Sequence, residues 1–136
     1  TNKELNNIID TNLKGTIFVT RFCLTSMGKG SRIINIGSVA GIHGIENQSI
    51  YCASKHGMNG FFESLQYELL SKGILISTIN PGGINTPLWN KENPYGGVVE
   101  RLLKPSDIVS VVNYIANLQN HVIFKNAVIY PSNENY

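Results

Sequence analysis

The stretch RIINIGSVAGIHGIENQSIYCASK (residues 32–55) decides the fold of this chain. Its first seven residues, RIINIGS, are nearly all apolar and end in a glycine and a serine. Such a run is typical of a strand that is buried on both faces, as in a parallel sheet. A polar segment with glycines follows from residue 39 to about residue 49, and helical spacing begins near residue 50. The stretch therefore predicts a strand, a loop and a helix.

The same alternation continues on both sides of this stretch. Apolar residues at three- and four-residue spacing predict one helix, or two closely joined helices, over residues 4–28, and a long helix over residues 50–70. ILISTIN (residues 74–80) predicts a second buried strand, and HVIFKNAVIY (residues 121–130) predicts a third. The order of helix and strand predicts an α/β fold with a parallel sheet and right-handed crossovers.

The second and third strands are separated by a loop and a helix. Residues 87–103 are rich in proline and glycine and predict a loop, with a short helix after Val98. Pro105-Ser106-Asp107 is a helix-start signal, and it predicts a helix that continues from Ile108 to Leu118.

Composition excludes several classes of protein. With 136 residues, 42% hydrophobic and 15% charged, the chain has the size and composition of one globular domain. Its scattered charges sum to only +2, which excludes a dedicated electrostatic binder of nucleic acid or of a membrane surface. Two cysteines make neither a disulfide scaffold nor a zinc site. We expect no metal and a reducing, cytoplasmic location.

Tyr51 and Lys55 lie four residues apart near the start of the long predicted helix, so they share one face. A phenol has an ordinary pKa near 10, which makes it a poor base at neutral pH. An ammonium one turn away stabilises the phenolate and brings that pKa toward the working range. The pair is thus a candidate general acid/base, although the spacing alone is common on helix surfaces.

Residues at the ends of the two buried strands strengthen this interpretation. Ser38 ends the first strand, and ligands bind at the carboxyl ends of the strands in open α/β sheets. Its hydroxyl can donate to a carbonyl oxygen or to the alkoxide that forms from it. Pro81-Gly82-Gly83 ends the second strand and lets a flat ring approach the backbone. Thr86 adds a hydroxyl for an amide or a phosphate.

Four motifs together resemble the classical short-chain dehydrogenases/reductases. They are DTNLKG with Asn12, IINIGSVAG with Ser38, YCASK with Tyr51 and Lys55, and NPGGINT with Thr86. Their order and spacing resemble the family's over nearly the whole chain. The resemblance implies a partial, doubly wound Rossmann-type sheet and an NAD(P)-dependent oxidoreductase that interconverts an alcohol and a carbonyl, with NAD or NADP as cofactor.

The resemblance also implies a role for each matching residue. Tyr51 is the expected general acid/base, and Lys55 lowers its pKa and binds the nicotinamide ribose. Ser38 is expected to polarise the substrate carbonyl, and Asn12 to hold a water that links Lys55 to solvent. The expected contacts of the nicotinamide end of the cofactor come from Pro81, Gly82, the Ile84 backbone and Thr86. Asparagine occurs 17 times, so without the resemblance Asn12 is a weak candidate.

One family motif has no counterpart in this sequence. The family's glycine-rich dinucleotide turn, in which backbone amides approach the pyrophosphate, is missing. We therefore interpret residues 1–136 as a single domain that corresponds to the family's C-terminal catalytic half, without the N-terminal dinucleotide-binding half. We favour a truncated sequence over a genuine half-domain. Without the missing strands, the strand at residues 32–38 is expected to form an exposed edge.

Two further residues are candidate substrate contacts, and the function has alternatives. His43, between Ser38 and Tyr51, and Trp89, in the variable loop that covers the family's substrates, are expected to face a small alcohol or carbonyl compound. In the family the long helices pair between subunits, which predicts a homo-oligomer. The main alternative is a catalytically inactive half-domain that acts as an interaction or dimerisation module. A third hypothesis, an epimerase or dehydratase, needs a larger substrate domain than the residues after Thr86 provide.

Overall fold

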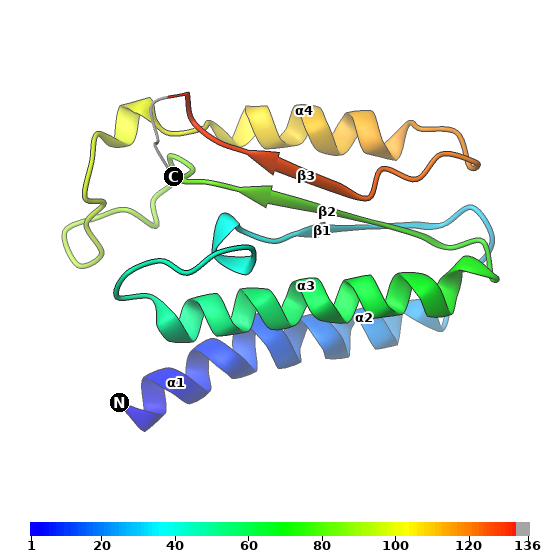
Figure 1. Ribbon diagram of the computed structural model, residues 1–136, viewed down its shortest axis with the longest axis horizontal. Coiled ribbons are helices and arrows are strands. Elements are labelled where there is room, and N and C mark those ends of the chain that lie inside the picture. Colours follow the sequence, from blue (N-terminus) through cyan, green and yellow to red (C-terminus); the bar gives the residue numbers. More distant parts are fainter. Residues whose placement is uncertain (133–136) are drawn as a thin grey trace.

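The computed structural model describes residues 1–132 and forms three layers. Strands β1 (Arg32–Ile36), β2 (Leu75–Pro81) and β3 (Asn126–Ile129) run parallel in the order β1-β2-β3. Helix α4 (Pro105–Ala116) lies on one face of this sheet, and α1, α2 and α3 lie on the other face (Figure 1). Figure 1 therefore agrees with the predicted α/β fold, in which three parallel strands alternate with helices.

The first helix is continuous but changes its pitch. Helix α1 (Asn2–Ile8) passes through a π-helical segment at residues 9–15 into α2 (Thr16–Leu24), which matches the prediction of closely joined helices. The N-terminal end is capped, because the Thr1 side chain accepts a hydrogen bond from the Glu4 backbone amide. Single π-helical turns are rare and often occur at functional sites, and this one contains Asn12.

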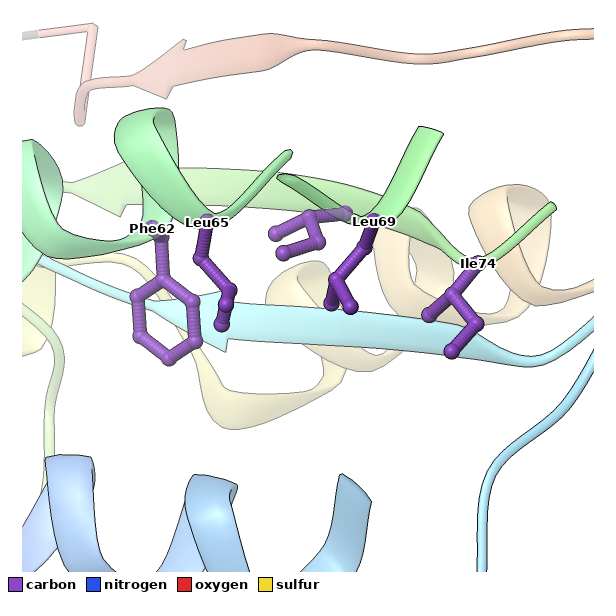
Figure 2. Close-up of a cluster of buried hydrophobic side chains, with 5 residues drawn as sticks. Phe62, Leu65, Leu69 and Ile74 are labelled. Carbon is purple, nitrogen blue, oxygen red and sulfur yellow. The ribbon is translucent and has the colours of Figure 1, made fainter. Parts of the chain in front are cut away.

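Helix α3 (Ser49–Leu70) builds the hydrophobic core against the sheet. Its apolar residues recur at helical spacing, and four core residues lie together in Figure 2: Phe62, Leu65, Leu69 and Ile74. Ile76 of β2 completes the buried cluster. Burial of each such side chain contributes about 1.5–3 kcal/mol, which anchors α3 on the sheet and fixes where its first turn lies.

The predicted third strand, residues 121–130, is too long. Strand β3 covers only Asn126–Ile129, although the Lys125 carbonyl already accepts a hydrogen bond from the Thr78 amide. The preceding segment turns because the Arg32 guanidinium donates to the carbonyl oxygens of Leu118, Gln119 and Val122. A cation from β1 thus bonds the Val122 carbonyl, which the apolar pattern assigns to a strand, and two carbonyl groups just before it.

The described residues leave β1 and β3 as the two edges of the sheet, as the sequence predicts for β1. Ile36 on β1 is 41% exposed, which is unusual for a strand so rich in isoleucine. The carboxyl ends of the strands, the start of α3 and the long segment after β2 gather at one end of the molecule (Figure 1). Parallel topology therefore gathers the predicted site residues at a single end.

Candidate active site

A cleft of about 760 Å³ opens at the carboxyl ends of the strands. Its lining comes from α1, from the loops after β1 and β2, and from the start of α3. Seven of the residues named by the sequence analysis line it: Ser38, Tyr51, Pro81, Gly82, Ile84, Thr86 and Trp89. The fold therefore brings together in one cavity residues that are up to 51 positions apart in the chain.

Ser38 lies at the point where β1 ends and a short 3-10 turn, residues 39–41, begins. Its Oγ accepts a hydrogen bond from the Ala40 amide at 3.1 Å, and its carbonyl accepts one from the Gly41 amide at 2.8 Å. Because the hydroxyl oxygen already accepts a bond, the hydroxyl proton is oriented away from the Ala40 amide. The side chain lines the cleft, so this proton can serve a substrate oxygen there.

Tyr51 and Lys55 lie in the first two turns of α3, on the shared face that their spacing predicts. The Lys55 Nζ lies 5.7 Å from the centroid of the Tyr51 ring, within the range of a cation–π contact. Burial lowers the pKa of Lys55, because desolvation penalises its charged form. Tyr51 lines the cleft, whereas Lys55 is half-buried and is not among the lining residues.

Asn12 reaches the same helix from the π-helical segment. Its Nδ2 donates to Ser54 Oγ at 3.2 Å, and Ser54 Oγ in turn donates to the Tyr51 carbonyl at 2.7 Å. Through this bond Asn12 contacts Ser54, the residue that precedes Lys55 in α3. The water-mediated link between Asn12 and Lys55 stays a prediction.

The residues after β2 form the wall opposite the start of α3. Pro81, Gly82, Ile84 and Thr86 all line the cleft. The Ile84 carbonyl accepts a hydrogen bond from the indole Nε1 of Trp89 at 2.8 Å, so one of its two lone pairs is already used within the protein. A carboxamide group is a donor of the same kind.

The two predicted substrate contacts differ in their positions. Trp89 lines the cleft and packs against Tyr95, with ring centroids 5.1 Å apart. The loop that carries both aromatic rings thus covers one side of the cavity. His43 is half-buried and lies outside the lining, so its contact with a substrate stays a prediction with no support from its position.

Sequence reasoning missed two features of this site. Glu4 and Ile8 of α1 also line the cleft, and only the tertiary fold brings them there. Asn80, which is completely buried, accepts a hydrogen bond from the Ser38 amide. The sequence signal for Asn80, an amide at the end of a buried strand beside Pro81, is weak among 17 asparagines.

No three His, Cys, Asp or Glu side chains within residues 1–132 gather as metal ligands would. None of the helices in this part of the chain combines the length and apolar character that a membrane span requires. Cys23 is exposed and Cys52 is buried, both as free thiols.

Comparison with known proteins places this geometry in a family. The family model described as short chain dehydrogenase matches residues 1–95. Among curated proteins, the chain is 33% identical over 131 residues to 3-oxoacyl-(acyl-carrier-protein) reductase FabG of Rickettsia bellii, covering 90% of this chain and 54% of that protein. The chain thus spans about half the length of the curated relatives that it matches.

Solved structures agree with this assignment. Serine dehydrogenase of Escherichia coli superposes with a TM-score of 0.83 at 27% identity, covering all of this chain and 57% of the other. A closed form of serine dehydrogenase complexed with NADP+ gives a TM-score of 0.90 at 26% identity, covering all of this chain and 59% of the other. The three parallel strands with their helices are therefore part of a Rossmann-type sheet, and the chain belongs to the short-chain dehydrogenase family.

Proposed function

We propose that the protein is an NAD(P)-dependent oxidoreductase that interconverts an alcohol and a carbonyl, with Tyr51 as the general acid/base. One observation carries the proposal: Ser38 and Tyr51 line the same cleft, and the Lys55 Nζ lies 5.7 Å from the Tyr51 ring. In reduction, the Ser38 hydroxyl donates to the carbonyl oxygen of the substrate. Tyr51 delivers the proton that this oxygen gains, and Lys55 stabilises the phenolate that remains.

The opposite wall suits a nicotinamide ring. Pro81 and Gly82 bring backbone close to the cleft, and the second lone pair of the Ile84 carbonyl, beside the one bonded to Trp89, would accept from a carboxamide. When bound, the nicotinamide supplies or accepts the hydride. Lys55 would hold the ribose and Thr86 the carboxamide or pyrophosphate. The similar serine dehydrogenase complexed with NADP+ supports this class of cofactor.

The substrate that we propose is a 3-oxoacyl thioester or another small carbonyl compound. The proposal rests on the 3-oxoacyl reductase relatives and on the apolar part of the cleft wall formed by Ile45, Leu88 and Trp89. Apolar walls favour a substrate with an acyl chain, because its burial is driven by the hydrophobic effect. The free thiols of Cys23 and Cys52 support the further proposal of a reducing, cytoplasmic location.

An activity assay on the protein made from its natural gene tests this function. We expect acetoacetyl-coenzyme A to be reduced with NADPH or NADH, and the corresponding alcohol to be oxidised in reverse. Isothermal titration with each dinucleotide gives the binding step separately. If the dinucleotide binds but acetoacetyl-coenzyme A is not reduced, the proposed substrate class is wrong. If the dinucleotide does not bind and no substrate is turned over, the proposed enzymatic function is overturned. That result would favour the alternative of an interaction module.

The outer face of α2 supports a homo-oligomer, which we also propose. Phe18 and Phe22 lie four residues apart on one face and are 64% and 78% exposed, and Val19 beside them is 64% exposed. Exposed apolar patches of this kind mark association surfaces. A second copy presenting the same face would bury both patches around a twofold axis.

Phe22→Glu tests this association. The substitution places a charge on the patch, and we expect it to shift the protein from dimer or larger oligomer to monomer in sedimentation velocity. Glu100→Gln alters an exposed charge outside both α2 and α3 and serves as the control. A wild-type protein that sediments as a monomer at micromolar concentration would contradict the proposal.

A further inference from the structure

We propose that Asn80 is a positioning residue that holds Ser38 in its working orientation through a chain of three asparagines. The inference deepens the proposed function and rests on it. Asn80 is completely buried at the end of β2, where its Oδ1 accepts a hydrogen bond from the Ser38 amide at 3.3 Å. Its Nδ2 donates to Asn126 Oδ1 on β3 at 2.9 Å.

The third member comes from α3. Asn59 Nδ2 donates both to Asn80 Oδ1 at 3.1 Å and to the Gly41 carbonyl at 3.0 Å. The chain of amides therefore contacts the Ser38 turn at both of its ends, at the Ser38 N–H and at the Gly41 carbonyl. It joins this turn to β2, β3 and α3.

Backbone groups fix the direction of every side-chain bond in the chain of amides. The Ser38 N–H can only donate, so the oxygen of Asn80 must face it. The Gly41 carbonyl can only accept, so the nitrogen of Asn59 must face it. Asn59 Oδ1 is buried without a hydrogen-bond partner among the described residues, a costly arrangement that the two bonds from Nδ2 offset.

Two glycines make room for these amides under the turn. A Cβ on Gly37 would overlap Asn80 Oδ1, and a Cβ on Gly41 would lie 2.6 Å from Asn59 Nδ2. Gly37 also donates the last backbone bond of the ladder, to the Ile79 carbonyl at 2.8 Å. The amide of the following residue, Ser38, donates to the Asn80 side chain on the same neighbouring strand.

The chain of amides affects the chemistry through the position of the Ser38 hydroxyl. The Ser38 hydroxyl is oriented by its bond from the Ala40 amide within the turn, and the amides orient the turn. A small displacement of a reacting group can cost a large factor in rate, because the donor must face the developing charge. Asn80 itself does not line the cleft, so it acts through Ser38.

Kinetics of four variants of the protein made from its natural gene, with acetoacetyl-coenzyme A and NADPH, test the role. We expect Asn80→Ala to lower kcat about tenfold or more, with little change in the dinucleotide dissociation constant. In a Ser38→Ala background the same substitution should cost almost nothing further, because the group that it positions is gone. Asn35→Ala removes another buried amide of the sheet, bonded to Thr78 Oγ1, and should leave kcat unchanged.

A second readout does not depend on activity. Asn80→Ala should accelerate hydrogen exchange of the Ser38 amide by at least about tenfold, while Asn35→Ala leaves it protected. If Asn80→Ala does not fold, Asn126→Ala on the more exposed end of the chain of amides takes its place, with a smaller loss of kcat expected. Multiplicative losses in the double variant, or equal losses in Asn80→Ala and Asn35→Ala, would overturn the positioning role while the proposed function stands. Unchanged kcat in Ser38→Ala would instead overturn the function assigned to Ser38.

Discussion

Tyr51→Phe is expected to lower kcat for carbonyl reduction at least about a hundredfold, the usual contribution of a positioned general acid. The substitution removes one oxygen from a ring that lines the cleft beside Ser38, and it keeps the ring that faces the Lys55 Nζ. Without the hydroxyl, the alkoxide formed in the cleft must take its proton from water. Steady-state kinetics over a range of pH measure the loss and show whether the pH dependence of the rate disappears with it.

The same helix supplies a matched control. Tyr67 is also on α3, is 64% exposed, and has the Lys125 Nζ 5.6 Å from its ring centroid. This tyrosine–lysine pair thus repeats the local contact of Tyr51 and Lys55 outside the cleft. Tyr67→Phe should leave kcat unchanged. A Tyr51→Phe protein that retains more than about half of the wild-type rate would remove Tyr51 from the proposed mechanism.

The local pattern was sufficient to predict most of the fold. Residues 32–38 and 74–80 predict strands that the structure has at Arg32–Ile36 and Leu75–Pro81, because continuous apolar runs of this length suit strands covered on both faces. The helix predicted over residues 50–70 is present at Ser49–Leu70. In each case the deciding signal lies within the segment itself.

The errors arise where a distant residue decides the local structure. Residues 121–125 have the apolar pattern of a strand, but Arg32, about 90 positions earlier, draws carbonyl groups of the preceding segment into a turn. The first strand stops short of the predicted Ser38 for a related reason: Gly37 makes the last backbone bond, and the Ser38 amide is bonded by the Asn80 side chain. No periodicity within either segment contains this information.

The candidate site likewise contains residues that the sequence predicts and residues that only the tertiary structure reveals. The motif residues Ser38, Tyr51 and Thr86 line one cleft as predicted from the topology of parallel sheets. Asn80 was hidden among 17 asparagines, and only its complete burial and its bond to Ser38 single it out. Glu4 enters the cleft because a continuous helix of some twenty residues carries it alongside α3, which composition and spacing cannot show.

Lys55→Met is expected to inactivate the protein and to stabilise it. Removal of the ammonium should lower kcat about a hundredfold, since the phenolate loses its neighbouring cation. Dinucleotide binding should weaken about tenfold or more, as is usual when a charged hydrogen bond is lost. Titration calorimetry and steady-state kinetics separate the two effects, and a loss of rate alone would contradict the proposed ribose contact.

The stability change has a defined dependence on pH. Burial lowers the pKa of Lys55 below its ordinary value of 10.5, because the charged form loses solvation in the folded state. Below the folded-state pKa the lysine is protonated in both states, so the whole cost of burying the charge is present. Between that pKa and 10.5 the unfolded state binds more protons than the folded state, so the free energy of unfolding rises with pH.

Thermal unfolding of Lys55→Met and wild type should therefore differ most at neutral pH, with the variant having the higher Tm, and the difference should narrow as the pH approaches 10.5. Lys125→Met is the control, because Lys125 is exposed and lies over the Tyr67 ring at nearly the same distance. A variant less stable than wild type at neutral pH would mean that the contacts of Lys55 outweigh its desolvation. A variant that is more stable but inactive would show that Lys55 lowers the stability of the folded protein. A role in packing does not explain such a lysine, whereas a role in catalysis does.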